Sequence, residues 1–203
     1  MKRRAAPAAL AALAALAAVA LALGGCGSNV YIGSQENDPA VTEFRCERHD
    51  GGPSGMLVLI AQSVPSAPAV PCVRGEPGRW TMSEFTVRDG SAVIGFAYQY
   101  GGPDRVTVEL RPSCDVHDAK EVSSQHEGSR RYNRPLVLGG RYANEIYFVH
   151  EGACTLLRFD LVATGADLRG AEFTGALGFV TRAEIDRQIR AATDGHLTLD
   201  PAG

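Results

Sequence analysis

The sequence predicts a mainly β domain of antiparallel meanders, sandwich-like or half-barrel in form, with one C-terminal α-helix and disulfide staples. Three observations predict it: apolar and polar residues alternate between glycine-containing turns, four cysteines lie in the body of the chain, and one late segment has a helical period. The 203 residues are 45% hydrophobic and 21% charged, which suits one globular domain. A formal charge of −3 gives no support to nucleic-acid binding.

The first strand is expected at residues 56–61, a short apolar run suited to a buried strand. A hairpin follows at residues 84–100, because Asp89-Gly90 between two extended stretches is the strongest short hairpin signal. Its two-residue turn places Phe85 opposite Ile94 and Val87 opposite Ala92. Residues 105–111 alternate in the same way and complete a three-strand meander.

A second β-unit is expected from residues 141–150 and 155–163, joined by a turn at residues 151–153. The polar stretch at residues 117–133 between the two units is expected to be a loop. Residues 166–175 resemble two pentapeptide repeats, but a stacked solenoid needs more neighbours, so a loop or short helix is preferred.

The C-terminal helix is expected to begin after Thr181. Thr181 and Glu184 have capping-box spacing. The apolar side chains that would share one helix face are Ile185, Ile189 and Ala192. Gly195 is a suitable stop, and the chain is expected to return as a short strand at Leu197 and Leu199.

The amino terminus has the order of a secretory signal peptide at residues 1–25. Three basic residues precede an apolar Ala/Leu/Val run, and small residues follow. Leu23-Gly24-Gly25-Cys26 resembles the bacterial lipobox. The resemblance implies that the chain is cut before Cys26, which carries lipid, including palmitate, and holds the protein on the outer face of the cell membrane. Two alternatives remain open: an uncleaved anchor, since the run approaches the ~20 residues that span a membrane, and an incidental cysteine after an ordinary secretory signal.

The predicted mature chain divides into a lipidated, flexible tether at residues 26–42 and one extracytoplasmic domain at residues 43–203. The tether is polar, contains Gly, Ser, Asn and Pro, and shows no helical period. The alternative for this segment is an edge strand at residues 29–32. Removal of residues 1–25 takes away three basic residues and no acidic one, so the formal charge changes from −3 to −6.

Four further cysteines are expected to form disulfides in an oxidising compartment: Cys46, Cys72, Cys114 and Cys154. No CxxC spacing occurs, so neither a zinc ribbon nor a thioredoxin-like motif is predicted. Of the three pairings that four cysteines allow, Cys46–Cys72 and Cys114–Cys154 are preferred because each pair links neighbouring segments. In the chain-entropy model each such loop contributes about 3–4 kcal/mol.

Sequence motifs of catalysis are absent: there is no HExxH, GxSxG or GxxxxGK. Asp115, His117 and Asp118 could offer metal ligands, but without a third defined ligand a solvated loop is the preferred interpretation. His49-Asp50 could serve acid–base chemistry, yet it lies in a turn rich in glycine and proline. No metal and no cofactor are therefore predicted.

A basic stretch supplies the candidate anion-binding residues, which are Arg130, Arg131, Arg134 and Arg141, with Tyr132 and Tyr142 among them. Arginine can bind phosphate or carboxylate with two hydrogen bonds, and tyrosine can pack on a ligand. The alternative is an ordinary surface whose arginines are neutralised by Glu127 and Glu145.

The region between Cys46 and Pro201 also resembles uncharacterised actinobacterial membrane lipoproteins. The similar residues are VPSAPAVPCVR at 64–74, with Trp80 shortly after it, and LGFVTRAEID at 177–186. The resemblance implies a location but no catalytic residues. The favoured function is a non-enzymatic module that binds an anionic envelope ligand or another envelope protein. The alternative is an envelope hydrolase that uses His117 or His150 with Asp115, Asp118 or Glu151.

Overall fold

A computed structural model describes residues 44–47, 52–75, 79–99 and 102–201 of the chain. Cys26, the predicted signal and tether, and His49-Asp50 lie outside the described residues. Within them, no helix is long and apolar enough to cross a membrane.

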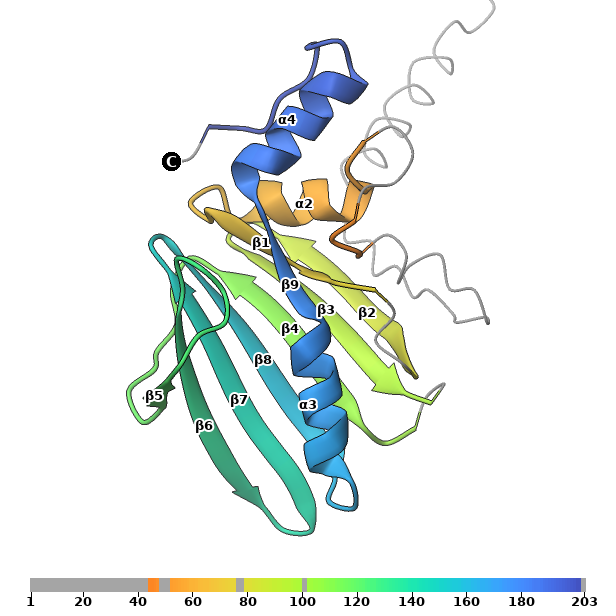
Figure 1. Ribbon diagram of the computed structural model, residues 1–203, viewed down its shortest axis with the longest axis vertical. Helices are drawn as coiled ribbons and strands as arrows, with labels where there is room; N and C mark the ends of the chain where they lie inside the picture. The colour runs from red at the N-terminus through yellow and green to blue at the C-terminus, as the bar shows by residue number, and fades with distance from the viewer. Residues whose placement is uncertain (1–43, 48–51, 76–78, 100–101, 202–203) are drawn as a thin grey trace, which may run out of the picture.

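The main element is an open, fully antiparallel sheet of seven strands (Figure 1). Its order from edge to edge is β2 (Trp80–Arg88), β3 (Ser91–Tyr98), β4 (Arg105–Arg111), β8 (Ala153–Val162), β7 (Arg141–His150), β6 (Arg130–Leu138) and β5 (Lys120–Val122). A two-stranded sheet pairs β1 (Ala69–Val73) with β9 (Leu177–Thr181). The described helices are α2 (Gly55–Ser63), α3 (Ala166–Ala176) and α4 (Arg182–Ala192).

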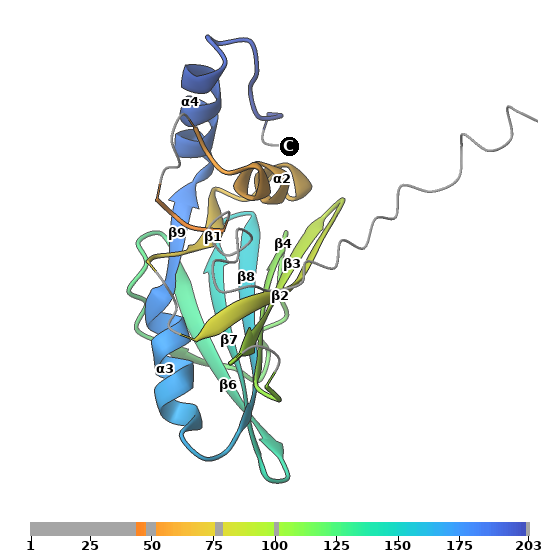
Figure 2. The same cartoon turned by 90° about the vertical axis from the view of Figure 1, so that its right-hand side faces the viewer.

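One face of the large sheet, here called the inner face, is covered by α3 and the β1–β9 pair, and α2 and α4 lie beyond one end (Figure 2). The opposite face is the outer face. The main core fills the space under the cover and includes Phe44, Phe96, Phe159 and Phe173. The ring of Phe173 on α3 packs 4.9 Å from Phe96 and 5.3 Å from Trp80, so α3 is fixed to the sheet by aromatic contacts.

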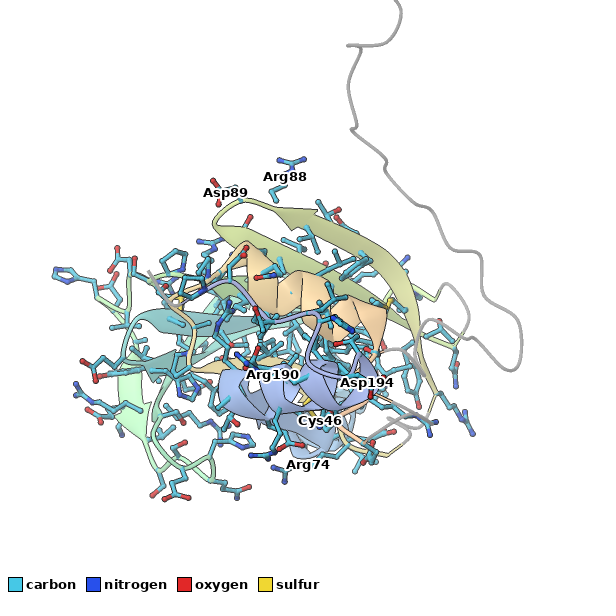
Figure 3. All side chains as sticks on the ribbon, turned by 90° about the horizontal axis from the view of Figure 1, so that it is seen from above. Cys46, Arg74, Arg88, Asp89, Arg190 and Asp194 are labelled. Carbon is cyan, nitrogen blue, oxygen red and sulfur yellow. A yellow bond between two sulfur atoms is a disulfide. The ribbon has the colours of Figure 1, made fainter. Side chains whose placement is uncertain are left out.

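The structure confirms the mainly antiparallel β fold and its meander. Phe85 pairs with Ile94 and Val87 with Ala92, as the Asp89-Gly90 turn predicts, and the third strand covers residues 105–111. Seen from above, Arg88 and Asp89 mark this turn on the side of the molecule opposite Arg74 (Figure 3).

The structure also confirms both disulfides, Cys46–Cys72 and Cys114–Cys154. Cys46–Cys72 lies directly against β9, where Gly178 leaves room for it. A Cβ at Gly178 would come 2.6 Å from the Sγ of Cys46, closer than packed atoms allow.

Helix α4 follows its predicted signals. The hydroxyl of Thr181 accepts a hydrogen bond from the backbone N–H of Glu184, and Ile185 and Ile189 are buried. Gly195 has a φ of +80° and donates its N–H to the carbonyl of Arg190, which satisfies the helix end. Ala192, however, is exposed and does not share the buried face.

Two local predictions and the expected number of helices are wrong. Residues 56–61 form helix α2 rather than a strand: an all-apolar run carries no periodicity, and the cap that decides it is Ser54, whose hydroxyl accepts from the N–H of Leu57. Residues 166–176 form helix α3, which agrees with the loop or short helix preferred there, but the structure has three described helices where one was expected. No strand forms at residues 197–199. Instead, the backbone N–H of Leu199 donates a hydrogen bond to the Asp186 side chain and so attaches this segment to α4.

The fourth difference concerns the predicted loop at residues 117–133. Its later part begins β6, which pairs along its whole length with β7, and residues 120–122 add β5. Strand β6 was not predicted because both of its faces carry polar side chains, so its sequence shows no alternation of apolar and polar residues. It is also the strand that holds three of the four candidate arginines.

Candidate functional site

Strand β6 separates the candidate arginines, because successive side chains of a strand point to opposite faces. Arg130 and Arg134 lie on the outer face with Tyr132, which packs in a small satellite core beside Tyr147. Arg131 lies on the inner face, where it borders α3 together with Asn133. The predicted four-arginine patch is therefore not one surface.

Three of the four arginines form ion pairs with carboxylates of the same chain. Arg130 Nη2 donates to Glu121 Oε2 at 2.6 Å, and Arg134 Nε donates to Glu145 Oε2 at 2.9 Å. Arg141 donates to Asp160 and to the carbonyl of Pro103. Neutralisation by Glu145 agrees with the alternative interpretation, whereas Glu121 rather than Glu127 neutralises Arg130.

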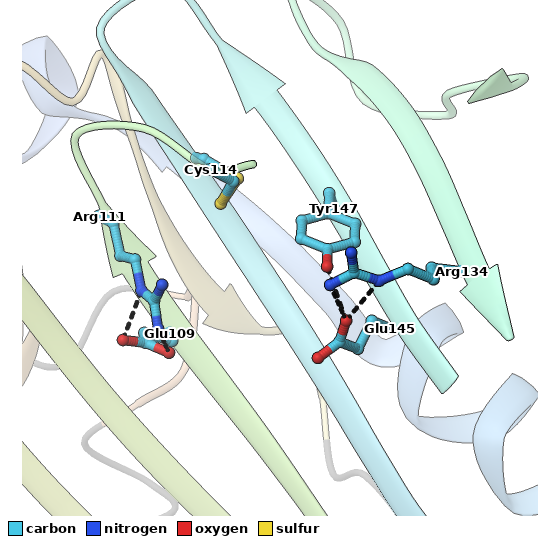
Figure 4. The surroundings of a disulfide bond; sticks show 7 residues. Glu109, Arg111, Cys114, Arg134, Glu145 and Tyr147 are labelled. Atoms are coloured by element: carbon cyan, nitrogen blue, oxygen red, sulfur yellow. Dashed lines mark hydrogen bonds and ion pairs between the residues drawn. A yellow bond between two sulfur atoms is a disulfide. The ribbon is translucent and has the colours of Figure 1, made fainter. Parts of the chain in front are cut away.

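Glu145 is the centre of a buried network on the outer face (Figure 4). Its carboxylate accepts hydrogen bonds from Tyr147 Oη at 2.6 Å and from the Nε atoms of Arg134 and Arg158, each at 2.9 Å. Burial alone would raise the pKa of Glu145, but these hydrogen bonds outweigh it and lower the pKa to about 2. Burial and the bond to Glu145 raise the pKa of Tyr147 to about 12. The network joins three strands, so we assign it to stability.

An open groove of about 710 Å³ lies on the inner face, between α3 and strands β5 to β7. Helix α3 forms one wall. Its side chains there are small, because the wall includes Gly170, Ala171 and Gly175. The opposite wall and floor combine polar with apolar side chains, namely Arg131, Asn133, Tyr142, Asn144, Ile146 and Phe159. This is the size and mixed lining typical of small-molecule sites.

Three of the buried polar atoms without partners belong to residues that line this groove, and others lie elsewhere, on Trp80, His150 and Thr155. Arg131 Nε, Asn133 Oδ1 and Asn144 Oδ1 are shielded from solvent, and none forms a hydrogen bond within the described part of the chain. The amide of Asn144 is oriented, since its Nδ2 donates to Tyr142 Oη at 3.2 Å, which leaves Oδ1 unpaired. Each such atom costs about 1–3 kcal/mol. Because three such atoms border one groove, this groove is the candidate ligand site.

The two asparagines were missed by the sequence interpretation. Asn144 shares its strand face with Ile146 and Phe148, so a polar side chain interrupts an otherwise apolar alternation on β7. That interruption is the feature of the sequence that could have identified Asn144 as a candidate site residue. Asn133 pairs across from Ile146, next to Asn144, and only the register of β6 on β7 brings the two amides together.

The two histidines of the hydrolase hypothesis, His117 and His150, differ in their surroundings. His150 is buried on the inner face, where its ring lies 5.3 Å from Phe179, and Phe179 lies 4.7 Å from His126. Burial lowers the pKa of both histidines, so they are neutral at pH 7. Asp115 and Asp118 are exposed in the segment that packs on the outer face through Cys114 and Val116.

His117 lies in this same exposed segment, and its backbone N–H donates to Asp115 Oδ1. The carboxylate therefore closes a local turn. Throughout residues 44–47, 52–75, 79–99 and 102–201, no group of three His, Cys, Asp or Glu side chains could hold a metal ion.

Comparisons with known proteins add little to the site. No family model and no curated protein matches the sequence. A crystal structure of a protein from Bacteroides thetaiotaomicron VPI-5482 is similar over 59% of this chain, with 11% identity and a TM-score of 0.35. The chain spans about half of that protein, 50% of its length.

Proposed function

We propose that the protein is a lipid-anchored, extracytoplasmic binding module and that the groove between α3 and the sheet is its ligand site. The observation that carries the ligand site is the set of unpartnered buried atoms on Arg131, Asn133 and Asn144. The lipobox-like Leu23-Gly24-Gly25-Cys26 supports the anchor. The two disulfides suit an exported protein.

The proposed role is binding without chemistry. Among the described residues that line the groove, the charged ones are Arg131 and Asp167, and hydrogen-bonding side chains alternate with apolar ones. Such a surface orients a ligand. His150, which is buried, packs against Phe179, and the half-buried His126 packs against Phe148, so neither is among the residues that line this groove.

The anchor is tested by replacing Cys26 with Ala. Because the thiol is the atom that would carry the diacylglyceryl group, C26A is expected to lose all incorporation of labelled palmitate and to accumulate as uncut precursor. A double C46A/C72A variant is the matched control and should still be labelled. Wild-type protein that is cleaved but unlipidated would contradict the proposal, as would a C26A protein that keeps its label.

A further inference from the structure

Arg131 is the cation of the groove that the protein leaves without a counterion. No carboxylate pairs with it in the described part of the chain, although Arg130 and Arg134, which flank it on β6, are paired. Its guanidinium lies 5.7 Å from the centre of the Phe148 ring, which holds it in place, and its Nε is buried. A positive charge held in this way favours an anion from outside the protein.

The charge balance of the groove favours a carboxylate over a phosphate. Arg131 is the one cation among the described residues that line the groove, and Asp167, in the first turn of α3, is the one carboxylate among them. Because no carboxylate pairs with Arg131 in the described part of the chain, its single charge can pair with one carboxylate of a ligand, whereas Asp167 in the same groove would repel a more highly charged anion. A phosphate carries nearly two, and it is normally held by several cations or by a series of backbone N–H groups.

The remaining polar atoms call for hydrogen-bond donors on the ligand. Asn133 Oδ1 and Asn144 Oδ1 are unpaired acceptors, and the carboxylate of Asp167 adds two acceptor oxygens on the opposite wall. Several acceptors that line one groove match a ligand with several hydroxyl groups, such as a sugar ring. An extended peptide offers about one N–H for each residue, and successive residues are ~3.3 Å apart along the chain. Its donors are therefore more widely spaced than the hydroxyls of a sugar ring, and it matches these acceptors less well.

Apolar surface completes the match. Ile146 and Phe159 contribute to the floor and Tyr142 adds an aromatic ring, so the face of a sugar ring can pack here while its hydroxyls reach the amides. The groove is open and holds about 710 Å³, within the range of about 300–1,000 Å³ of ligand sites.

We infer that the ligand of the groove is an acidic saccharide, in which a carboxylate pairs with Arg131 and ring hydroxyls donate to Asn133, Asn144 and Asp167. This inference rests on the proposed function, since it names the ligand class for the same groove. It replaces the four-arginine patch with one arginine and two asparagines. No covalent step is involved.

The test is calorimetric titration of the purified full-length protein in non-ionic detergent. The probes are trisaccharides of glucuronate, galacturonate and mannuronate, each beside its neutral counterpart, and the tripeptide Gly-Gly-Asp. At least one uronate trisaccharide is expected to bind ten-fold or more tightly than its neutral counterpart and than the tripeptide. Arg131→Gln should weaken this binding at least ten-fold.

Arg130→Gln is the matched control, because Arg130 is the next residue of the same strand but lies on the other face, paired with Glu121. Binding by this variant should stay within two-fold of wild type. Thermal unfolding midpoints verify that both variants are folded. If Arg131→Gln does not fold, Arg131→Lys keeps a cation over Phe148 but loses the two-pronged geometry, and weaker binding is again expected.

Several outcomes would overturn the inference: no uronate binds, a neutral trisaccharide or the tripeptide binds equally well, or Arg131 and Arg130 variants behave alike. Each of these rejects the acidic saccharide as the ligand class. None by itself rejects the groove as a binding site, because that proposal is tested without any ligand through the stability of asparagine variants.

Discussion

Replacement of Glu145 by Gln is expected to lower the free energy of unfolding by about 3 kcal/mol at pH 7. The ordinary pKa of this carboxyl is 4.5 and its pKa in the folded protein is about 2. A tenfold change in a proton-binding constant corresponds to about 1.4 kcal/mol. The substitution removes the charge that Arg134 and Arg158 share and weakens the bond from Tyr147. Breaking a buried pair typically costs about 3–5 kcal/mol, which agrees.

The pH dependence of this contribution has a definite sign. Because the folded pKa lies below the unfolded one, the ionised carboxyl stabilises the fold fully above pH 4.5, and this stability is lost as the pH falls towards 2. The lowered pKa values of His126 and His150 cost further stability as the pH falls below 6.5, but they do so equally in wild type and in E145Q. The difference between the two proteins therefore isolates Glu145.

Urea unfolding of wild type, E145Q and the control E121Q measures this effect. Glu121 also pairs with an arginine, but both partners are about half exposed or more, at 50% and 66% of their side-chain surface. Exposed pairs contribute little because water and salt screen them, so E121Q should stay close to wild type. Equal losses in the two variants would mean that the buried network gives no special stability.

Removal of the Cys114–Cys154 disulfide is expected to have the second large effect. The bond closes a loop with a sequence separation of 40 residues, for which the chain-entropy model gives about 4 kcal/mol. It also fixes the segment of Cys114, Val116 and Ala119 over Tyr147 and Leu156 on the outer face. A C114A/C154A variant should therefore unfold at a much lower urea concentration.

The unreduced wild type and the C46A/C72A variant provide the comparison for this measurement. Cys46–Cys72 spans a separation of 26 residues, so its loss should cost a similar but slightly smaller amount. Adding a reductant should lower the urea unfolding midpoint of the wild type to that of the C114A/C154A variant or below it. An unfolding midpoint of C114A/C154A equal to that of oxidised wild type would contradict this expectation.

Much of the fold follows from local patterns. The Asp89-Gly90 turn determines the hairpin register, and Thr181 with Glu184 determines the start of α4, because both signals act within a few residues. The run at residues 56–61 could not be assigned in the same way, since an element that is apolar on all sides has no period. Its cap, Ser54, was the deciding local signal.

The site was only partly predictable, because it depends on strand register. The sequence drew attention to Arg131 but grouped it with Arg130 and Arg134, which the alternation of β6 sends to the outer face. Asn133 and Asn144 become neighbours only when β6 pairs with β7. A polar residue inside an apolar strand face, as at Asn144, is the pattern that would have indicated the groove.

The stability of an Asn133→Leu/Asn144→Leu variant tests the groove most directly, and it needs no ligand. Both acceptors are buried and unpaired in the structure, so replacing them with apolar side chains of similar size removes a cost of about 1–3 kcal/mol each. We therefore expect the free energy of unfolding in urea to stay equal to that of wild type or to rise, as at sites kept for function. A loss of about 2 kcal/mol or more would mean that the asparagines support the fold, and the groove would no longer stand as a ligand site.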